Sequence, residues 1–129
     1  MKHLLDSHTL LWYTLGEAQL SGTASKLILD PANEIFISPA SYWEIAIKIS
    51  IGKLTLHQPY EDFVDACLNQ YGFTILPITP KHTGALTTMP FHHKDPFDRL
   101  LVAQALVEDI PIVSIDTVLD QYGIKRIWE

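Results

Sequence analysis

The chain has 129 residues, of which 47% are hydrophobic and 19% are charged, proportions of a folded globular protein and not of a disordered one. Its 15 acidic residues outnumber nine lysines and arginines, and the net charge of −6 argues against a broad basic surface for nucleic acid, although it does not exclude a nuclease. No apolar run reaches the roughly 20 residues of a membrane helix, and the lone Cys67 suits a reducing compartment, so we expect a cytoplasmic protein without a membrane segment.

Strands and helices are predicted to alternate through the first 71 residues. A short apolar run over residues 3–5 predicts a buried strand that ends at Asp6, and Ser7 is positioned to cap the helix that follows. Ser38 followed by Pro39 repeats the start signal of a helix. Cys67 lies on the apolar stripe of the last helix in this half, which favours a buried structural thiol over a nucleophile. We therefore expect strands at residues 3–5 and 34–37 and helices at residues 7–15, 21–29, 39–51 and 60–71.

The second half continues the alternation. Residues 73–78 are predicted to form a strand that lies at the sheet edge or ends early, because Pro77 cannot donate a ladder hydrogen bond. We expect helices at residues 80–88 and 96–108, a strand at residues 112–115 and a last apolar piece at residues 124–128. This order implies an α/β fold with a mostly parallel sheet and helices on both faces, and the lack of a linker or repeat predicts one domain over residues 1–129.

The helix predicted for residues 96–108 carries an acid on its apolar face. Asp95 and Pro96 suit the N-cap and the first helical position, so the carboxylate of Asp98 falls in the first turn. On a 3.6-residue period Asp98 shares a face with Leu101 and Ala105, where a buried charge needs a positive partner, either an arginine or a metal ion. The alternative is that Asp98 completes the helix cap and favours the helix dipole, and this stretch alone leaves both interpretations open.

Three further acids are predicted to approach Asp98. Asp6 and Asp116 each follow a strand and Glu44 lies near the start of its helix, positions that meet at the carboxyl edge of an open α/β sheet, where ligands bind. Oxygen donors of this kind suit Mg²⁺ or Mn²⁺. Each acid also has a simpler interpretation, Asp6 and Asp116 as helix caps and Glu44 as an exposed i,i+4 pair with Lys48. No zinc-type spacing, P-loop, glycine-rich dinucleotide turn or GxSxG motif competes with this cluster.

The segments that carry these acids resemble a known family. The stretches WEIAIK at residues 43–48 and HKDPFDRLLVAQA at residues 93–105, together with residues 4–8 and 113–116, are similar to the PIN-domain nucleases. In particular they resemble the VapC-like ribonuclease toxins of bacterial type II toxin–antitoxin pairs, and the similarity extends over essentially the whole chain. The resemblance implies a PIN-like three-layer sandwich, with the chain forming a single PIN domain.

The resemblance also implies a site and an activity. The implied catalytic metal ligands are four acids: Asp6, Glu44, Asp98 and Asp116. Ser114 matches a position where the family carries a small hydroxyl residue near the metal. The implied activity is endonucleolytic hydrolysis of RNA phosphodiester bonds by water, with Mg²⁺ or Mn²⁺ as cofactor and no covalent intermediate. The implied partners are the RNA substrate, a small antitoxin protein and a second copy of the chain, and Trp43 and Phe97 are expected in the core or in the interface of such a homodimer.

Three side chains near the acids have two interpretations each. Lys48 and Arg99 either contact RNA or form structural ion pairs. His93 either contacts the substrate or forms a backbone hydrogen bond, and its pairing with His92 departs from the family pattern.

Two rival functions are considered. A response-regulator-like receiver also binds Mg²⁺ through acids, but it requires a second acid next to Asp6 and an acid at the end of the strand predicted for residues 73–78, and both are missing. The second rival is a catalytically silent PIN-like scaffold that only binds a partner. The presence of all four acids disfavours it, but the sequence does not prove that the acids are used.

Overall fold

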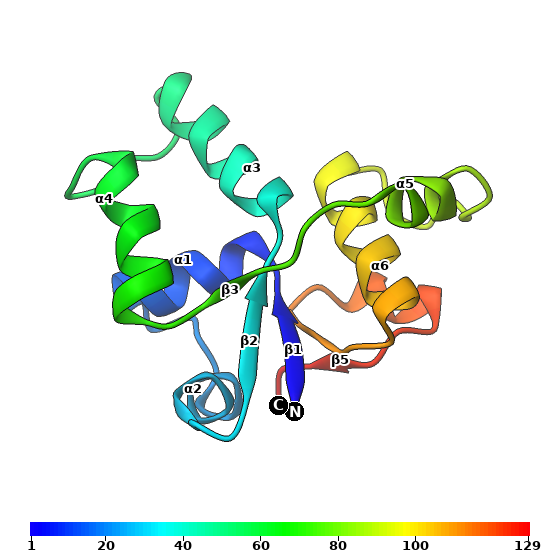
Figure 1. Ribbon diagram of the computed structural model, residues 1–129, viewed down its shortest axis with the longest axis horizontal. Coiled ribbons are helices and arrows are strands. Elements are labelled where there is room, and N and C mark those ends of the chain that lie inside the picture. Colours follow the sequence, from blue (N-terminus) through cyan, green and yellow to red (C-terminus); the bar gives the residue numbers. More distant parts are fainter.

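A five-stranded parallel sheet forms the centre of the protein in the computed structural model, which describes residues 1–129 (Figure 1). The strands are β1 (Lys2–Leu5), β2 (Glu34–Ile37), β3 (Thr74–Ile75), β4 (Ile112–Val113) and β5 (Arg126–Ile127), and they lie in the order β3-β2-β1-β4-β5. The chain builds outward from β1 to β3 and then returns to the other side of β1 with β4. The winding therefore reverses between β1 and β4, the position at which open α/β sheets bind ligands.

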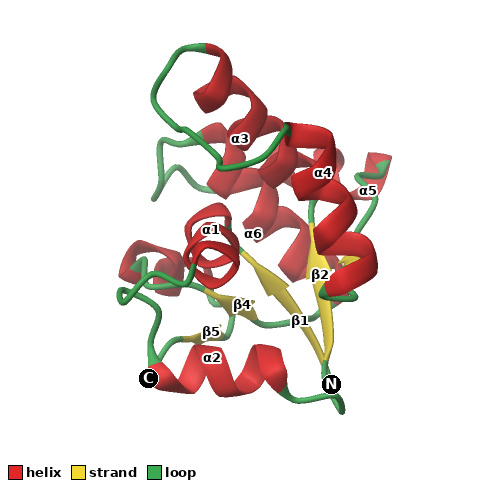
Figure 2. Cartoon of the chain, turned by 90° about the vertical axis from the view of Figure 1, so that its left-hand side faces the viewer, coloured by secondary structure: helices red, strands yellow, loops and turns green.

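Helices cover both faces of this sheet. They are α1 (Ser7–Leu15), α2 (Gly22–Leu29), α3 (Pro39–Ser50), α4 (Tyr60–Asp65), α5 (Pro80–Leu86) and α6 (Pro96–Glu108), with a π-helical turn η1 (Ala66–Gln70) and a 3-10 helix η2 (Thr117–Tyr122). In Figure 1, α4 lies on one side of the strands and α5 and α6 lie on the other. The view turned by 90° shows α3 and α4 above the strands and α2 below them (Figure 2). The predicted three-layer α/β sandwich is confirmed.

Alternate residues of β1, β2 and β4 face two separate cores. Leu5 and Val113 point to the core that α1, α2, α3 and α4 complete, and Leu4 and Ile112 point to the core that α6 completes. This period of two is the side-chain alternation of a strand whose two faces are both buried. Cys67 lies fully buried in the first core as a free thiol, and burial raises its pKa to about 11, which confirms the structural interpretation.

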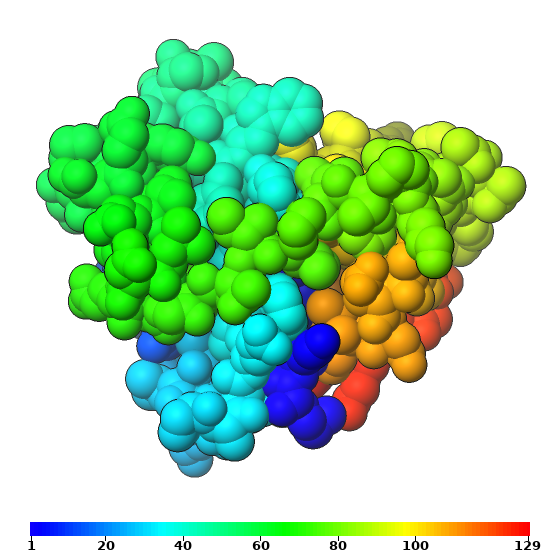
Figure 3. Space-filling view, in the orientation of Figure 1, coloured from blue at the N-terminus to red at the C-terminus, as the bar shows by residue number.

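Several predicted elements differ in extent from the structure, and most of the strands are shorter than predicted. The strand at β4 ends at Val113 and not at residue 115, and the helix predicted for residues 60–71 changes from α to π geometry at Ala66. The prediction for Pro77 is confirmed, because β3 is short and lies at the edge of the sheet. Figure 3 shows the green segment that leads from α4 through β3 to α5 crossing this side of the molecule. No helix has the length and apolar character needed to cross a membrane.

The helix starts follow the capping signals, with one correction. Ser38 caps α3 through a hydrogen bond from Ala40 N, and Pro39 occupies the first helical position. The residue that caps α1 is Asp6 and not Ser7. Ser7 is the first residue inside the helix, which leaves its hydroxyl free to bind a different partner.

Candidate functional site

Asp6 directly follows β1 and Asp116 lies just beyond β4, the neighbouring strand. Each is the N-cap of the helix that comes next. Asp6 Oδ1 accepts a hydrogen bond from Thr9 N at 2.9 Å, and Asp116 Oδ1 accepts one from Val118 N at 3.0 Å. Capping is therefore a real role of both residues, but it uses only one carboxylate oxygen, and the second oxygen of each is left for another partner.

The start of α6 divides two roles between two acids. Asp95 is the N-cap, and its Oδ1 accepts hydrogen bonds from Phe97 N at 2.8 Å and from Asp98 N at 3.3 Å. The carboxylate of Asp98 makes no cap hydrogen bond and contacts His93 in the cleft that Asp6 also lines. The sequence left open whether Asp98 caps the helix or carries a charge that needs a positive partner. In the structure Asp95 is the cap, and the carboxylate of Asp98 faces the cleft.

Three of the predicted acids line one cleft of about 430 Å³. Asp6, Asp98 and Asp116 reach it from the ends of two strands and from the first turn of α6. The remaining walls are formed by His8, Trp12, His93 and Ile115. The chain topology thus brings together carboxylates that are far apart in the sequence.

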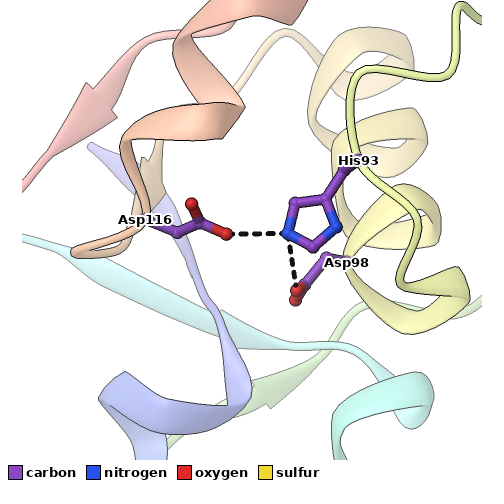
Figure 4. A group of neighbouring side chains, drawn as sticks. All are labelled: His93, Asp98 and Asp116. Atoms are coloured by element: carbon purple, nitrogen blue, oxygen red, sulfur yellow. Dashed lines mark hydrogen bonds and ion pairs between the residues drawn. The ribbon is translucent and has the colours of Figure 1, made fainter.

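His93 lies between two of these carboxylates (Figure 4). Its Nε2 is 2.7 Å from Asp116 Oδ2 and 3.3 Å from Asp98 Oδ2. Its Nδ1 accepts a hydrogen bond from Asp95 N at 3.1 Å, so the expected backbone hydrogen bond is present. The contact with the two acids was not expected, and it makes His93 part of the cluster.

Glu44 lies behind the cleft and does not line it. Its Oε1 accepts a hydrogen bond from Ser7 Oγ at 2.6 Å, and Lys48 Nζ lies 3.5 Å from its Oε2. The predicted pair with Lys48 exists, but Glu44 is buried and not exposed. Of the four predicted acids, Glu44 is therefore the one that does not line the cleft.

The clustered charges change the acidity of Asp98. Burial is the largest cause that raises the pKa of Asp98, and it brings the value to about 7 together with the neighbouring negative charges. Among these charges, Asp95 raises the pKa of Asp98 most, Asp6 raises it less, and Glu44 raises it least. His93 lowers the pKa of Asp98. Because Glu44 affects this pKa, its charge reaches the cleft although its side chain does not.

The remaining predicted residues support the site from outside it. Ser114 is fully buried, and its Oγ accepts a hydrogen bond from Asp116 N at 3.0 Å, which fixes the turn after β4. Arg99 is buried, and it donates to Pro90 O at 2.7 Å and lies 3.9 Å from the centre of the Phe91 ring. Its partners are backbone carbonyls and aromatic side chains, not the carboxylate of an ion pair.

A model of the PIN domain family matches residues 3–125 of the chain. The chain belongs to the PIN domain family. Members of this family are generally nucleases that use a divalent metal. A search of curated proteins gives no match to this PIN domain.

Solved structures share the fold of this PIN domain. A chain of VapBC2 from Rickettsia felis, bound to a DNA fragment from its promoter, matches over 100% of both chains with a TM-score of 0.72 and 14% identity. FitAcB from Neisseria gonorrhoeae matches over 97% of this chain and 96% of that chain, with a TM-score of 0.68 and 15% identity. VapBC-1 from nontypeable Haemophilus influenzae matches over 98% and 97%, with a TM-score of 0.65 and 17% identity. At these identities the likeness establishes the fold.

The donor set of this PIN domain fits a hard divalent cation. Asp6, Asp98 and Asp116 offer carboxylate oxygens, the ligands that Mg²⁺ and Mn²⁺ prefer. The raised pKa of Asp98 indicates that ionising this carboxyl group is costly without added positive charge, and a divalent cation supplies that charge.

Two contacts of this PIN domain have no signal in the sequence. Ser7 Oγ donates to Glu44, and Tyr122 Oη accepts a hydrogen bond from His93 N at 2.8 Å. Both join segments that only the folded chain brings together. Trp43 and Phe97 lie outside the core, because Trp43 is 63% exposed and packs edge-on against Phe97, with ring centres 5.2 Å apart. Of the two predicted locations, the interface of a homodimer is the one that stays a prediction.

Proposed function

We propose that this PIN domain is a metal-dependent endoribonuclease that hydrolyses RNA phosphodiester bonds and acts as the toxin of a toxin–antitoxin pair. The observation that carries the proposal is the convergence of Asp6, Asp98 and Asp116 on one cleft of about 430 Å³. The family supports nuclease chemistry, and the solved structures with the same fold are VapBC and FitAB complexes.

Asp6, Asp98 and Asp116 would hold Mg²⁺ or Mn²⁺ at the cleft, with Glu44 as the fourth acid behind them. When bound, such a cation makes a coordinated water more acidic and neutralises charge on the phosphodiester. Ser7 and Lys48 keep the carboxylate of Glu44 in place from two sides.

The substrate would be held by a few cations and not by a basic surface. The net charge of −6 repels a polyanion, so contacts with RNA must be local, and Lys48 and Arg99 are the proposed cationic positions. His93 lines the cleft near the reacting phosphate, whereas the buried Ser114 would act only through its hydrogen bond to Asp116 N. Arg99 can reach RNA only if the segment it holds at Pro90 moves. We therefore expect Lys48 to carry more of this role.

A protein partner is the second part of the proposal. An apolar groove of about 510 Å³ lies between α3, α4 and β3, with Trp43, Tyr60, Val64 and Ile75 among its lining residues. An exposed apolar surface of this kind suits a protein partner, and we propose an antitoxin and a second copy of the chain as the partners of a cytoplasmic toxin.

The test is cleavage of total bacterial RNA by the purified protein with Mn²⁺, using Asp98→Asn beside the wild type. We expect internal cuts by the wild type and at least about a hundredfold less cleavage by Asp98→Asn, since catalysis loses a ligand of the cation. Asp62→Asn, which changes an exposed acid of α4, is the matched control and should cleave normally. No cleavage by a folded wild type would favour the partner-binding scaffold.

A further inference from the structure

The imidazole of His93 is fixed through both of its nitrogens. The backbone N–H of Asp95 can only donate, so Nδ1 of His93 is the acceptor in their 3.1 Å hydrogen bond and carries no proton. The proton of the neutral ring is then on Nε2. Asp116 Oδ2 at 2.7 Å and Asp98 Oδ2 at 3.3 Å are acceptors for that Nε2–H (Figure 4).

The loop that carries His93 is also held in place. The N–H of His93 donates to Tyr122 Oη at 2.8 Å, and Arg99 donates to Pro90 O at 2.7 Å in the same loop. The side chain of His93 is 17% exposed. Turning the ring to present a different nitrogen to the cleft would break the hydrogen bond to Asp95 N.

We propose that His93 is a positioning residue that orients the carboxylates of Asp98 and Asp116 through its Nε2–H, and that it is not a ligand of the divalent cation. This inference rests on the proposed metal site. A histidine ligates a metal through an unprotonated ring nitrogen. In this protein the unprotonated Nδ1 already accepts from the backbone, and the nitrogen that faces the cleft carries the proton.

The assignment determines the chemistry of the donor set. His93, Asp98 and Asp116 lie close enough together to form a mixed nitrogen and oxygen site, with ligand atoms all within 4.8 Å of one another. An imidazole ligand would favour metals such as Zn²⁺ and Ni²⁺. With His93 as a donor to the acids, the ligands are carboxylate oxygens alone, which suit Mg²⁺ and Mn²⁺.

Calorimetric titration of Mn²⁺ into the wild type, His93→Gln and His93→Ala separates the roles. The side-chain amide of glutamine supplies an N–H donor in place of Nε2–H. We expect His93→Ala to weaken Mn²⁺ binding by roughly tenfold or more, the usual effect of losing a hydrogen bond to a ligand, and His93→Gln to recover most of it. Equal loss in both variants would show that an N–H donor at this position does not support Mn²⁺ binding, and tighter binding by His93→Ala would make His93 a competitor of the cation; either result overturns the proposal.

Nitrogen-15 NMR of the imidazole gives a readout that a general loss of stability would not change. We expect the Nε2–H tautomer of His93 in the metal-free protein and the same tautomer after Mg²⁺ is added. A proton on Nδ1, or loss of the Nε2 proton on adding Mg²⁺, would contradict the proposal. If the wild type and Asp98→Asn both fail to bind Mn²⁺, the proposed metal site is wrong, whereas the tautomer in the metal-free protein still tests the position of the His93 proton.

Discussion

At the scale of single residues, the acids of this PIN domain have separable roles. Asp95 caps a helix and Asp98 does not, although both lie at the start of α6. The sequence could indicate this division because Asp-Pro is a strong start signal and because Asp98 shares a face with apolar residues. It could not indicate that Glu44 lies behind the cleft or that His93 joins two acids, since both facts depend on contacts between distant segments.

Replacing Asp98 with asparagine should stabilise the metal-free protein. The folded-state pKa of about 7 lies above the ordinary value of 3.8, so ionisation of Asp98 opposes folding. The penalty is absent below about pH 4, grows through the interval between the two values and is complete above pH 7. We expect Asp98→Asn to raise the free energy of unfolding by about 1 kcal/mol or more at pH 8 and by little at pH 4. Urea denaturation in chelator measures this, and equal stability of both proteins at pH 8 would contradict it.

Mn²⁺ should raise the melting temperature of the wild type, and more strongly at pH 8 than at pH 6. A cation that binds only the folded state stabilises it by an amount that grows with its concentration, about 2.7 kcal/mol at 100 times Kd. Protons compete for Asp98 below its pKa of about 7, which weakens the effect at pH 6. Thermal melts with and without Mn²⁺ at the two pH values test this. If Mn²⁺ raises the melting temperature of Asp98→Asn by the same amount, the cation binds elsewhere.

At the scale of elements, the starts of helices were predictable and the ends of strands were not. Pro39 and Pro96 mark the starts of α3 and α6 correctly, because the cap and the proline are local signals. Ser114 and Ile115 do not extend β4, which pairs with β5 only over Ile112 and Val113, because strand length depends on contacts with neighbouring strands and not on local sequence alone. The sequence offered both Asp6 and Ser7 as the cap of α1, since both are good N-cap residues, and the structure selects Asp6.

His82 should be essential for holding α5 against α6. It is buried, its Nδ1 accepts a hydrogen bond from Thr79 N, and its Nε2 lies 2.8 Å from Glu108 Oε2. We expect His82→Ala to lower the free energy of unfolding by about 2 kcal/mol, since it leaves a cavity and removes two hydrogen bonds. Urea denaturation measures the loss. His57→Ala, at an exposed loop histidine, is the control, and an equally small change in both variants would contradict this role.

At the scale of the whole molecule, the reversal of winding between β1 and β4 positions the site. Two strand ends that carry Asp6 and Asp116 become neighbours, and the first turn of α6 supplies Asp98 to the same cleft. This convergence was predictable from the alternation of strands and helices, because the carboxyl edge of a parallel sheet collects such residues. The hydrogen bonds that hold His93 and Arg99 beside that edge were not predictable, because they depend on the path of a loop.

Expression of the whole chain without a partner should slow bacterial growth if the proposed toxin activity is correct. Asp6→Asn should relieve the effect, because asparagine caps α1 as well as aspartate does but lacks the ligand charge. Growth curves with matched protein levels measure this. Equal growth inhibition by the wild type and Asp6→Asn would show that toxicity does not depend on the carboxylate of Asp6.

The most direct test of the metal site is a calorimetric titration of Mn²⁺ into the wild type, Asp98→Ala and Asp95→Ala. We predict that binding is lost with Asp98 and kept with Asp95, whose removal costs only the helix cap, about 1 kcal/mol of stability. Binding that is absent from the wild type, or that survives in Asp98→Ala, would contradict the assignment of this cleft as a metal centre.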